Sequence, residues 1–378
     1  MNRLLEHCAR EQAWLLETIE ALVSLESPSG DAAAINACMA ALESRLCGIG
    51  GRAARITGGP AGDHLKVEFG SGPRQVLLLG HIDTVWPAGT LATRPFRSAG
   101  GALYGPGVFD MKAGLALAAS AIRALRHDAG ALPGRTVFLV TADEETGSAT
   151  SRAVIEAEAR LSEAVLVLEP ALPGGALKTS RKGCGGFELR VVGRAAHAGI
   201  EPERGASAVS ELARQVTRIE ALSDPAAGTT VTVGVVRGGT RPNVVPAEAQ
   251  ALIDVRAATA AEAARVTAAL GGLTPVDSRT RLTVEGGFDR PPMERSVATA
   301  RLYSLAREVA AGLGRELGEG GTGGGSDGNL TAALGVPTLD GLGATGGGAH
   351  AADEHVISAD LPWRAALLAG LLRRILAD

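Results

Sequence analysis

Apolar positions in the first half of the chain follow two alternating periods. They recur at helical spacing from about Leu4 to Ser24, and after a turn at Ser27–Asp31 a second helical pattern runs to about Leu46. A long Ala/Leu-rich helix is predicted from about Gly114 to Arg126. Four short β-prone runs occur in the same half, at 65–69, 76–79, 137–140 and 165–168. Strands that alternate with helices of this length predict an α/β fold with a doubly wound, mostly parallel sheet.

The pattern changes near Lys178. Four further strand-like runs follow, at 186–193, 230–236, 249–255 and 281–284. Helical patterns at about 205–219 and 260–270 fall between them, in the order strand-helix-strand-strand-helix-strand. This order is typical of a small ferredoxin-like α+β sheet with two helices on one face.

Helical spacing returns from Ser296, before a predicted strand at 336–339 and a final helix near 361–376. A chain of 378 residues is expected to form two domains. We predict a catalytic domain of residues 1–180 and 291–378 and an inserted α+β domain of residues 181–290.

Composition excludes several classes of protein. The net charge of -4 and the 3% aromatic content argue against nucleic-acid binding, which needs a basic face or stacking aromatics, so a small-molecule partner is expected. The four cysteines have neither zinc-site nor disulfide-framework spacing, and we expect them to be reduced. The first residues lack a signal-peptide pattern, and no apolar run reaches the roughly 18 residues of a membrane span. We therefore expect a soluble, cytoplasmic protein.

The most informative stretch is Val140–Ser148, which contains the pair Glu144 and Glu145 at the end of a predicted strand. Ligands of α/β proteins bind beyond the carboxyl ends of the strands. One of two adjacent carboxylates there can hold a metal while the other takes a proton from water. The alternative is a solvated cluster at a helix start, where acidic residues are also favoured.

Other polar residues with metal-ligand chemistry also follow strands or lie in loops. His81 and Asp83 come directly after the strand at 76–79, and side chains two residues apart in an extended segment point the same way. Asp83 is therefore expected to accept the second ring N–H of His81. Asp110 lies between glycines just before a helix, where a simple helix cap is the alternative.

Glu169 ends an apolar strand, where an unpaired buried charge would be costly, and His350 lies in a loop near the end of the chain. Together with His81, Asp110 and Glu145, they form a mixed imidazole and carboxylate set. Zinc accepts such a set, and two metals that share one bridging carboxylate would use all five residues.

Several motifs carry a family resemblance. In chain order they are His-Ile-Asp-Thr-Val at 81–85, Gly-Pro-Gly-Val-Phe-Asp-Met-Lys-Ala-Gly at 105–114, Ala-Asp-Glu-Glu-Thr-Gly-Ser at 142–148, Leu-Glu-Pro at 168–170, Ala-Ala-His-Ala-Gly at 195–199 and Gly-Thr-Gly-Gly-Gly-Ser-Asp-Gly at 321–328. The series resembles the M20 family of dinuclear zinc peptidases and amidohydrolases, and within it most of all the glutamate carboxypeptidase group. The likeness runs from about Glu17 to the C-terminus.

The resemblance implies roles for the metal-binding motifs. Asp110 would bridge two zinc ions, with His81 and Glu169 on one ion and Glu145 and His350 on the other. Cobalt or manganese could replace zinc, since these ligands discriminate weakly among such ions. Glu144 falls on the family's general base, and the peptide bond after Asp110 is expected to be cis.

The resemblance also implies roles within the inserted domain. His197 would reach the active site of the partner subunit in a homodimer and help to stabilise the oxyanion. Asn243 matches a substrate-contacting position, and Arg256 and Arg290 match arginines that recognise the substrate's α-carboxylate. A guanidinium group suits that role because it pairs with a carboxylate bidentately. The loop Gly323–Asp327, including Gly324, could form a nest of backbone N–H groups for the same anion.

These features predict a zinc-dependent enzyme that cleaves an amide or peptide bond next to an amino acid with a free carboxylate. The stretch Thr179–Gly183 departs from the glutamate carboxypeptidase type and leaves the substrate open. An N-acyl amino acid deacylase of the same family is the alternative. A catalytically silent binding protein is a third reading, against which the complete ligand set and Glu144 speak.

Overall fold

The computed structural model describes residues 2–129 and 132–377. They divide into two compact units. Unit 1 comprises Met1–Ser180, Arg295–Gly321 and Ser326–Asp378, and unit 2 comprises Arg181–Glu294 and Thr322–Gly325. The second boundary follows Glu294 rather than residue 290, and the sequence pattern did not separate Thr322–Gly325 from its neighbours.

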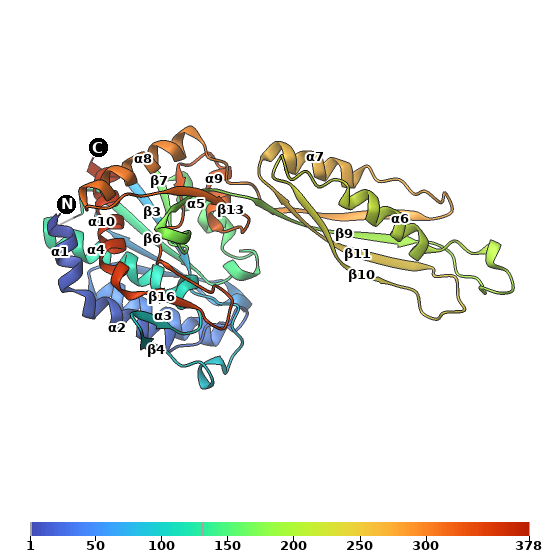
Figure 1. Ribbon diagram of the computed structural model, residues 1–378. Coiled ribbons are helices and arrows are strands. Elements are labelled where there is room, and N and C mark those ends of the chain that lie inside the picture. The colour runs from blue at the N-terminus through green and yellow to red at the C-terminus, as the bar shows by residue number, and fades with distance from the viewer. Residues whose placement is uncertain (1, 130–131, 378) are drawn as a thin grey trace. The chain divides into compact units, whose positions relative to one another are not determined.

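Unit 1 is built on a six-stranded sheet in the order β1-β2-β6-β3-β7-β14 (Figure 1). Its strands are β1 (Arg52–Ile56), β2 (His64–Phe69), β3 (Gln75–His81), β6 (Arg135–Thr141), β7 (Ala164–Val167) and β14 (Thr338–Leu339). Strands β6, β3, β7 and β14 are parallel to one another, while β2 pairs antiparallel with both β6 and β1. The predicted mostly parallel α/β sheet is therefore confirmed.

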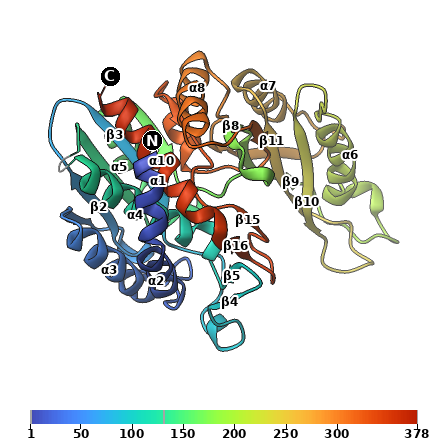
Figure 2. The same cartoon turned by 60° about the vertical axis from the view of Figure 1, so that its left-hand side comes forward.

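Helices cover both faces of this sheet (Figures 1 and 2). One face packs on a large core formed with α1 (Asn2–Arg10), α2 (Gln12–Val23), α3 (Ala32–Gly48), α4 (Ala113–Ala129), α8 (Val297–Gly312) and α10 (Leu361–Ala377). The other face packs on α5 (Arg152–Arg160) and α9 (Asp327–Ala333). In β3, Val76 and Leu78 enter the first core while Leu77 and Leu79 enter the second. Residues 76–79 of this central strand are all apolar because both of its faces are buried.

The helix predicted from Leu4 to Ser24 is two helices, because the backbone leaves helical geometry at Glu11 (φ -92°, ψ 13°). The carboxylate of Glu11 pairs with Arg123 of α4 at 2.5 Å. Helical periodicity continues across the break, so the pattern alone does not reveal it.

Smaller elements complete unit 1. A four-stranded sheet in the order β15-β16-β5-β4 joins β15 (Gly346–Gly347), β16 (His355–Ile357), β5 (Ala102–Tyr104) and β4 (Arg97–Ala99). A two-stranded sheet pairs β8 (Leu177–Arg181) with β13 (Glu319–Thr322). These strands were not predicted, since most are too short to show a period. No helix within residues 2–129 and 132–377 has the length and apolar character needed to cross a membrane.

Unit 2 has the predicted order of elements. They are β9 (Gly183–Val192), α6 (Ala208–Glu220), β10 (Thr230–Gly238), β11 (Glu248–Ala257), α7 (Ala260–Gly271) and β12 (Arg281–Arg290). The strands form an antiparallel sheet in the order β10-β11-β9-β12. Along β9, Phe187, Leu189 and Val191 enter a core with residues of α6 and α7, whereas Arg190 points to solvent. The helices therefore cover one face of the sheet.

Candidate active site

Three adjacent parallel strands bring the first site residues together. His81 ends β3, Glu145 lies in a 3₁₀ turn (Glu144–Thr146) just after β6, and Glu169 follows β7 by two residues. Because β6, β3 and β7 are neighbours and run the same way, their carboxyl ends share one edge of the sheet. Ligands of α/β proteins bind at that edge.

Asp110 and His350 reach the same place from outside the sheet. Asp110 lies in the irregular turn Val108–Lys112 before α4, and its peptide bond to Met111 is cis, as the resemblance implied. His350 lies in the loop between β15 and β16, and its φ of 61° is in the left-handed region. Such a backbone costs a non-glycine residue roughly 1–2 kcal/mol, so surrounding contacts must hold it.

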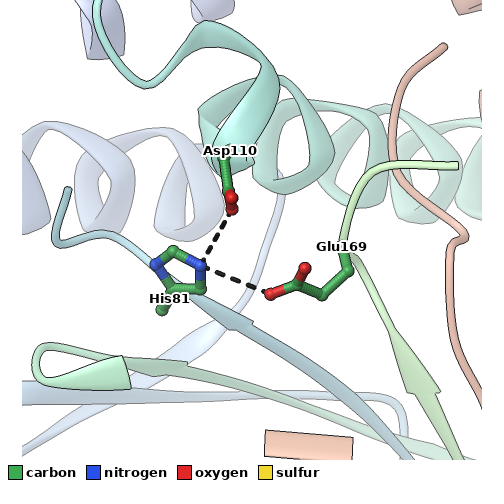
Figure 3. A group of neighbouring side chains, drawn as sticks. All are labelled: His81, Asp110 and Glu169. Carbon is green, nitrogen blue, oxygen red and sulfur yellow. Dashed lines mark ion pairs between the residues drawn. The ribbon is translucent and has the colours of Figure 1, made fainter. Parts of the chain in front are cut away.

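The five side chains form two groups that share Asp110. In the first group, His81 Nε2 lies 3.3 Å from Asp110 Oδ1 and 3.5 Å from Glu169 Oε1 (Figure 3). In the second group, His350 Nε2 lies 3.4 Å from Asp110 Oδ2 and 3.3 Å from Glu145 Oε1. Each oxygen of Asp110 therefore faces a different group, which is the arrangement that a bridging carboxylate requires.

The distances fit bound metal ions. Donor atoms held at about 2.0–2.2 Å by one tetrahedral ion lie roughly 3.3–3.6 Å from one another, and all four separations above agree. The buried atoms His81 Nε2, Asp110 Oδ1 and Glu145 Oε1 make no hydrogen bond with acceptable geometry to the described residues. Buried polar atoms are nearly always paired, so their arrangement points to a ligand. The donors also match zinc chemistry.

The site has a strong electrostatic bias toward cations. Burial lowers the pKa of His81, but the carboxylates of Asp110, Asp83 and Glu169 outweigh burial and raise it well above its ordinary value. Asp110 and Glu145 raise the pKa of His350 to about 10. Burial raises the pKa of Asp110, but the two histidines together hold it below its ordinary value. The negative charge of the carboxylates therefore favours a cation at both groups.

Asp83 faces the second ring nitrogen of His81 and also holds a neighbouring turn. The Nδ1 atom of His81 lies 3.0 Å from the backbone carbonyl oxygen of Asp83 and 3.5 Å from its carboxylate. The carboxylate also accepts hydrogen bonds from the backbone N–H groups of Glu144 and Glu145, both at 3.2 Å, and from Ser29 Oγ at 2.8 Å. Asp83 therefore holds the turn that carries both glutamates, a contact that alternation along one strand cannot predict.

The candidate residues of unit 2 separate into two clusters. His197 pairs with Val244 in a β-bridge, and the N–H of Ala198 donates to the carbonyl of Asn243 at 3.0 Å. His197 and Asn243 are therefore neighbours beyond the end of β9. His197 is exposed.

The second cluster lies at the start of β9. Arg256 of β11 and Arg290 of β12 flank Cys184 on its two sides. The guanidinium group of Arg181 donates to the carbonyl oxygens of Gly324 and Gly325, both at 3.0 Å. The glycine loop therefore lies against arginines at this end of unit 2.

The expected N–H nest at Gly323–Asp327 is interrupted. The N–H of Ser326 donates to the side chain of Asn329, and that of Gly324 points back to Thr322 Oγ1. Ser326 is the N-cap of α9, and this role removes its N–H from anion binding.

Glu354 is a site residue that the sequence analysis missed. Its buried carboxylate accepts hydrogen bonds from the N–H groups of Gly107, Phe109 and Asp110 and from Trp86 Nε1. Burial raises its pKa, although the four donors act in the opposite direction. The only sequence signal is an acidic pair, Asp353 and Glu354, shortly after His350, and such a pair is usually solvated.

Comparison with known proteins identifies the family. The description Peptidase family M20/M25/M40 matches residues 77–374. Carboxypeptidase G2 from Pseudomonas sp. (strain RS-16) is 32% identical over 98% of this chain and 91% of its own. The chain belongs to the M20 family. The resemblance to this family and to its glutamate carboxypeptidase group is thereby confirmed, and the protein is an M20 hydrolase.

Other similar proteins carry different names. Succinyl-diaminopimelate desuccinylase 2 from Shewanella loihica is 29% identical over 78% of this chain and 83% of its own. Among solved structures, aminopeptidase PepT from Bacillus cereus superposes with a TM-score of 0.80 at 22% identity, covering 96% of this chain and 98% of its own. The metallo-carboxypeptidase Sso-CP2 from Sulfolobus solfataricus reaches a TM-score of 0.74 at 17% identity, covering 96% and 99%. These two structures share the fold.

Proposed function

We propose that this M20 hydrolase uses two zinc ions to cleave an amide or peptide bond next to an amino acid with a free carboxylate. The name of its relative, carboxypeptidase G2, supports cleavage at a carboxyl-terminal residue. The observation that carries the proposal is the shared position of Asp110, whose two oxygens serve two separate donor groups. A single-metal or metal-free hydrolase would not need both groups.

The chain's residues divide the work of holding the metals. His81, Asp110 and Glu169 would hold one ion, and Asp110, Glu145 and His350 would hold the other. When bound, such ions polarise the substrate carbonyl and make water more acidic. Cobalt or manganese could serve in place of zinc, since all five ligands are imidazoles or carboxylates.

Glu144 would move the proton. It is part-buried, and its backbone N–H donates to Asp83 at 3.2 Å, so its position at the edge of the sheet is fixed beside Glu145. Its carboxylate would take a proton from the attacking water and then deliver it to the leaving nitrogen. A positioned general base of this kind contributes about 10²–10⁴-fold to the rate.

Unit 2 would supply substrate recognition. The forked guanidinium groups of Arg256 and Arg290 suit a carboxylate, and they lie near Gly324 at one end of the sheet. His197 and Asn243 lie beyond the other end, roughly 26 Å away if each of the eight residue steps from Cys184 to Val192 adds about 3.3 Å.

This separation supports a homodimer. The chain passes between the units at four places, which in unit 2 are Arg181, Glu294, Thr322 and Gly325, and all four lie near the arginine end of its sheet. His197 and Asn243 lie at the opposite end, and we propose that they complete the active site of a second chain.

The decisive variant is Glu144→Gln, which keeps the shape of the side chain but removes the base. We expect it to bind two metals per chain, as measured by elemental analysis, and to lose at least about 10²-fold in kcat. A variant that retains kcat within tenfold of wild type would exclude Glu144 as the base. Loss of a metal instead would show that Glu144 is a ligand.

The substrate class is tested separately. Zinc-loaded protein would be assayed on dipeptides and N-acyl amino acids with acidic or neutral C-terminal residues, with a chelator-treated control. Release of the C-terminal residue from dipeptides supports the carboxypeptidase proposal. Hydrolysis of N-acyl amino acids alone would favour the second candidate, a deacylase. The similarity to desuccinylases is the observation that supports this candidate.

A further inference from the structure

The carboxylate of Glu354 is 3% exposed and accepts four hydrogen bonds. Oε1 accepts from the backbone N–H groups of Phe109 at 2.9 Å and Asp110 at 3.0 Å. Oε2 accepts from the N–H of Gly107 at 2.9 Å and from Trp86 Nε1 at 2.7 Å. All four partners donate to the carboxylate, which therefore acts as an anion. Three of them are backbone N–H groups of the irregular turn before α4, so Glu354 stabilises this turn.

Glu354 belongs to the loop that carries His350. The N–H of Ala351 donates to the carbonyl of Gly348 at 2.8 Å, and that of Glu354 donates to Ala351 at 3.1 Å. These turns connect His350, with its left-handed backbone, to the buried carboxylate four residues later. Glu354 therefore ties the loop of His350 to the turn of Asp110.

Two of the three ligands in the first metal group, His81 and Glu169, are held without this tie. His81 ends the central strand, and beyond its end the N–H of Ile82 still donates to Thr141 of β6 at 3.0 Å. The N–H of Leu168, next to Glu169, donates to Leu79 of β3 at 2.9 Å. The main sheet thus places both of these ligands, whereas His350 lies in a loop between β15 and β16, two short strands of a separate sheet.

We propose that Glu354 is a positioning residue that sets the distance between Asp110 and His350 and thereby controls metal affinity selectively at the Asp110–Glu145–His350 group. It contacts Asp110 through the backbone N–H and not through the carboxylate, so it acts on the ligand and not on the substrate. The inference rests on the proposed metal centre.

The test is metal binding by Glu354→Gln. An amide keeps the size of the side chain but places an NH₂ group against backbone N–H donors. Stepwise zinc titration of the metal-stripped chain by calorimetry would resolve two affinities, and His350→Ala and His81→Ala would assign each to its group. We expect Glu354→Gln to weaken the His350 group by about 10–100-fold, the usual effect of losing an outer-shell partner, and to leave the other within about twofold.

Glu158→Gln is the matched control. Glu158 is also a buried carboxylate of unit 1, 7% exposed, and it accepts hydrogen bonds from Lys66 and from Gln75, which starts β3 at the end opposite His81. Its substitution should lower stability without changing either metal affinity. Equal weakening of both groups in Glu354→Gln, or unchanged affinities, would overturn the proposal.

A second measurement needs no metal. Hydrogen exchange of the metal-free chain should be faster in Glu354→Gln than in wild type at both 105–112 and 346–354, because the tie joins these segments. If Glu354→Gln does not fold, Trp86→Phe removes one donor and should produce a smaller shift of the same affinity. Wild-type protein that binds no metal would refute the proposed function itself, whereas normal binding by both Glu354→Gln and Trp86→Phe would refute only the role of Glu354.

Discussion

At the scale of single residues, the site is organised by carboxylates that act on other ligands. Asp83 is fully buried and holds the N–H groups of Glu144 and Glu145 while lying 3.5 Å from His81. We expect Asp83→Asn to reduce kcat by about 10–100-fold, since the amide cannot accept from all these donors and removes the negative charge beside His81. Steady-state kinetics at saturating zinc would measure it.

Ser29→Ala is the control for Asp83, because it removes the 2.8 Å contact to the same carboxylate but leaves the carboxylate in place. We expect the reduction in kcat of Ser29→Ala to be several-fold smaller than that of Asp83→Asn. A kcat for Asp83→Asn equal to that of wild type would show that the turn of Glu144 keeps its position without the carboxylate of Asp83.

At the scale of elements, unit 2 contains a buried anion that fastens α6 to the loop before β12. The carboxylate of Glu211 is buried and accepts from Gln215 Nε2 at 2.6 Å and from the backbone N–H groups of Val276 and Asp277, both at 2.9 Å. Burial raises the pKa of Glu211, but these donors outweigh burial and hold it below its ordinary value. The charged form is therefore the one that stabilises the fold.

We expect Glu211→Gln to destabilise unit 2 by about 1–3 kcal/mol at pH 7, because an amide NH₂ would face a backbone donor. Since the folded pKa is depressed, this stabilisation is complete above the unfolded carboxyl pKa of about 4.3 and is lost as pH falls through the folded pKa. Hydrogen exchange of residues 208–220 in both proteins would measure the difference. A stability difference between wild type and Glu211→Gln that increased below about pH 4 would contradict this role of the Glu211 carboxylate.

At the scale of the whole molecule, the proposed dimer predicts complementation between two inactive variants. In a mixed dimer, one active site would contain the intact Glu144 of the His197→Ala chain and the intact His197 of the Glu144→Gln chain. Co-expressed variants should then recover roughly a quarter of wild-type activity, since half of the random dimers have one working site. Each variant alone, at the same total concentration, is the control. If His197 served its own chain, no activity above that of the single variants would return.

The elements of the main sheet and of unit 2, and the chemistry of the ligands, could largely be predicted from the sequence. The unbroken apolar run of β3 required burial on both faces, and the period of two along β9 required one covered face. His81, Glu145 and Glu169 each followed a strand, so their shared edge could be predicted once the strands were parallel and adjacent. These properties are local, and a periodic pattern records them.

Which atoms meet could not be predicted without the three-dimensional structure. It showed that Asp83 holds the turn of the two glutamates, and that Glu354 reaches Gly107 across 247 positions of the chain. It also divided the inserted unit's candidates between two ends of one sheet. The physical reason is that such contacts depend on packing between distant segments, and a buried carboxylate has the same local sequence pattern as a solvated one.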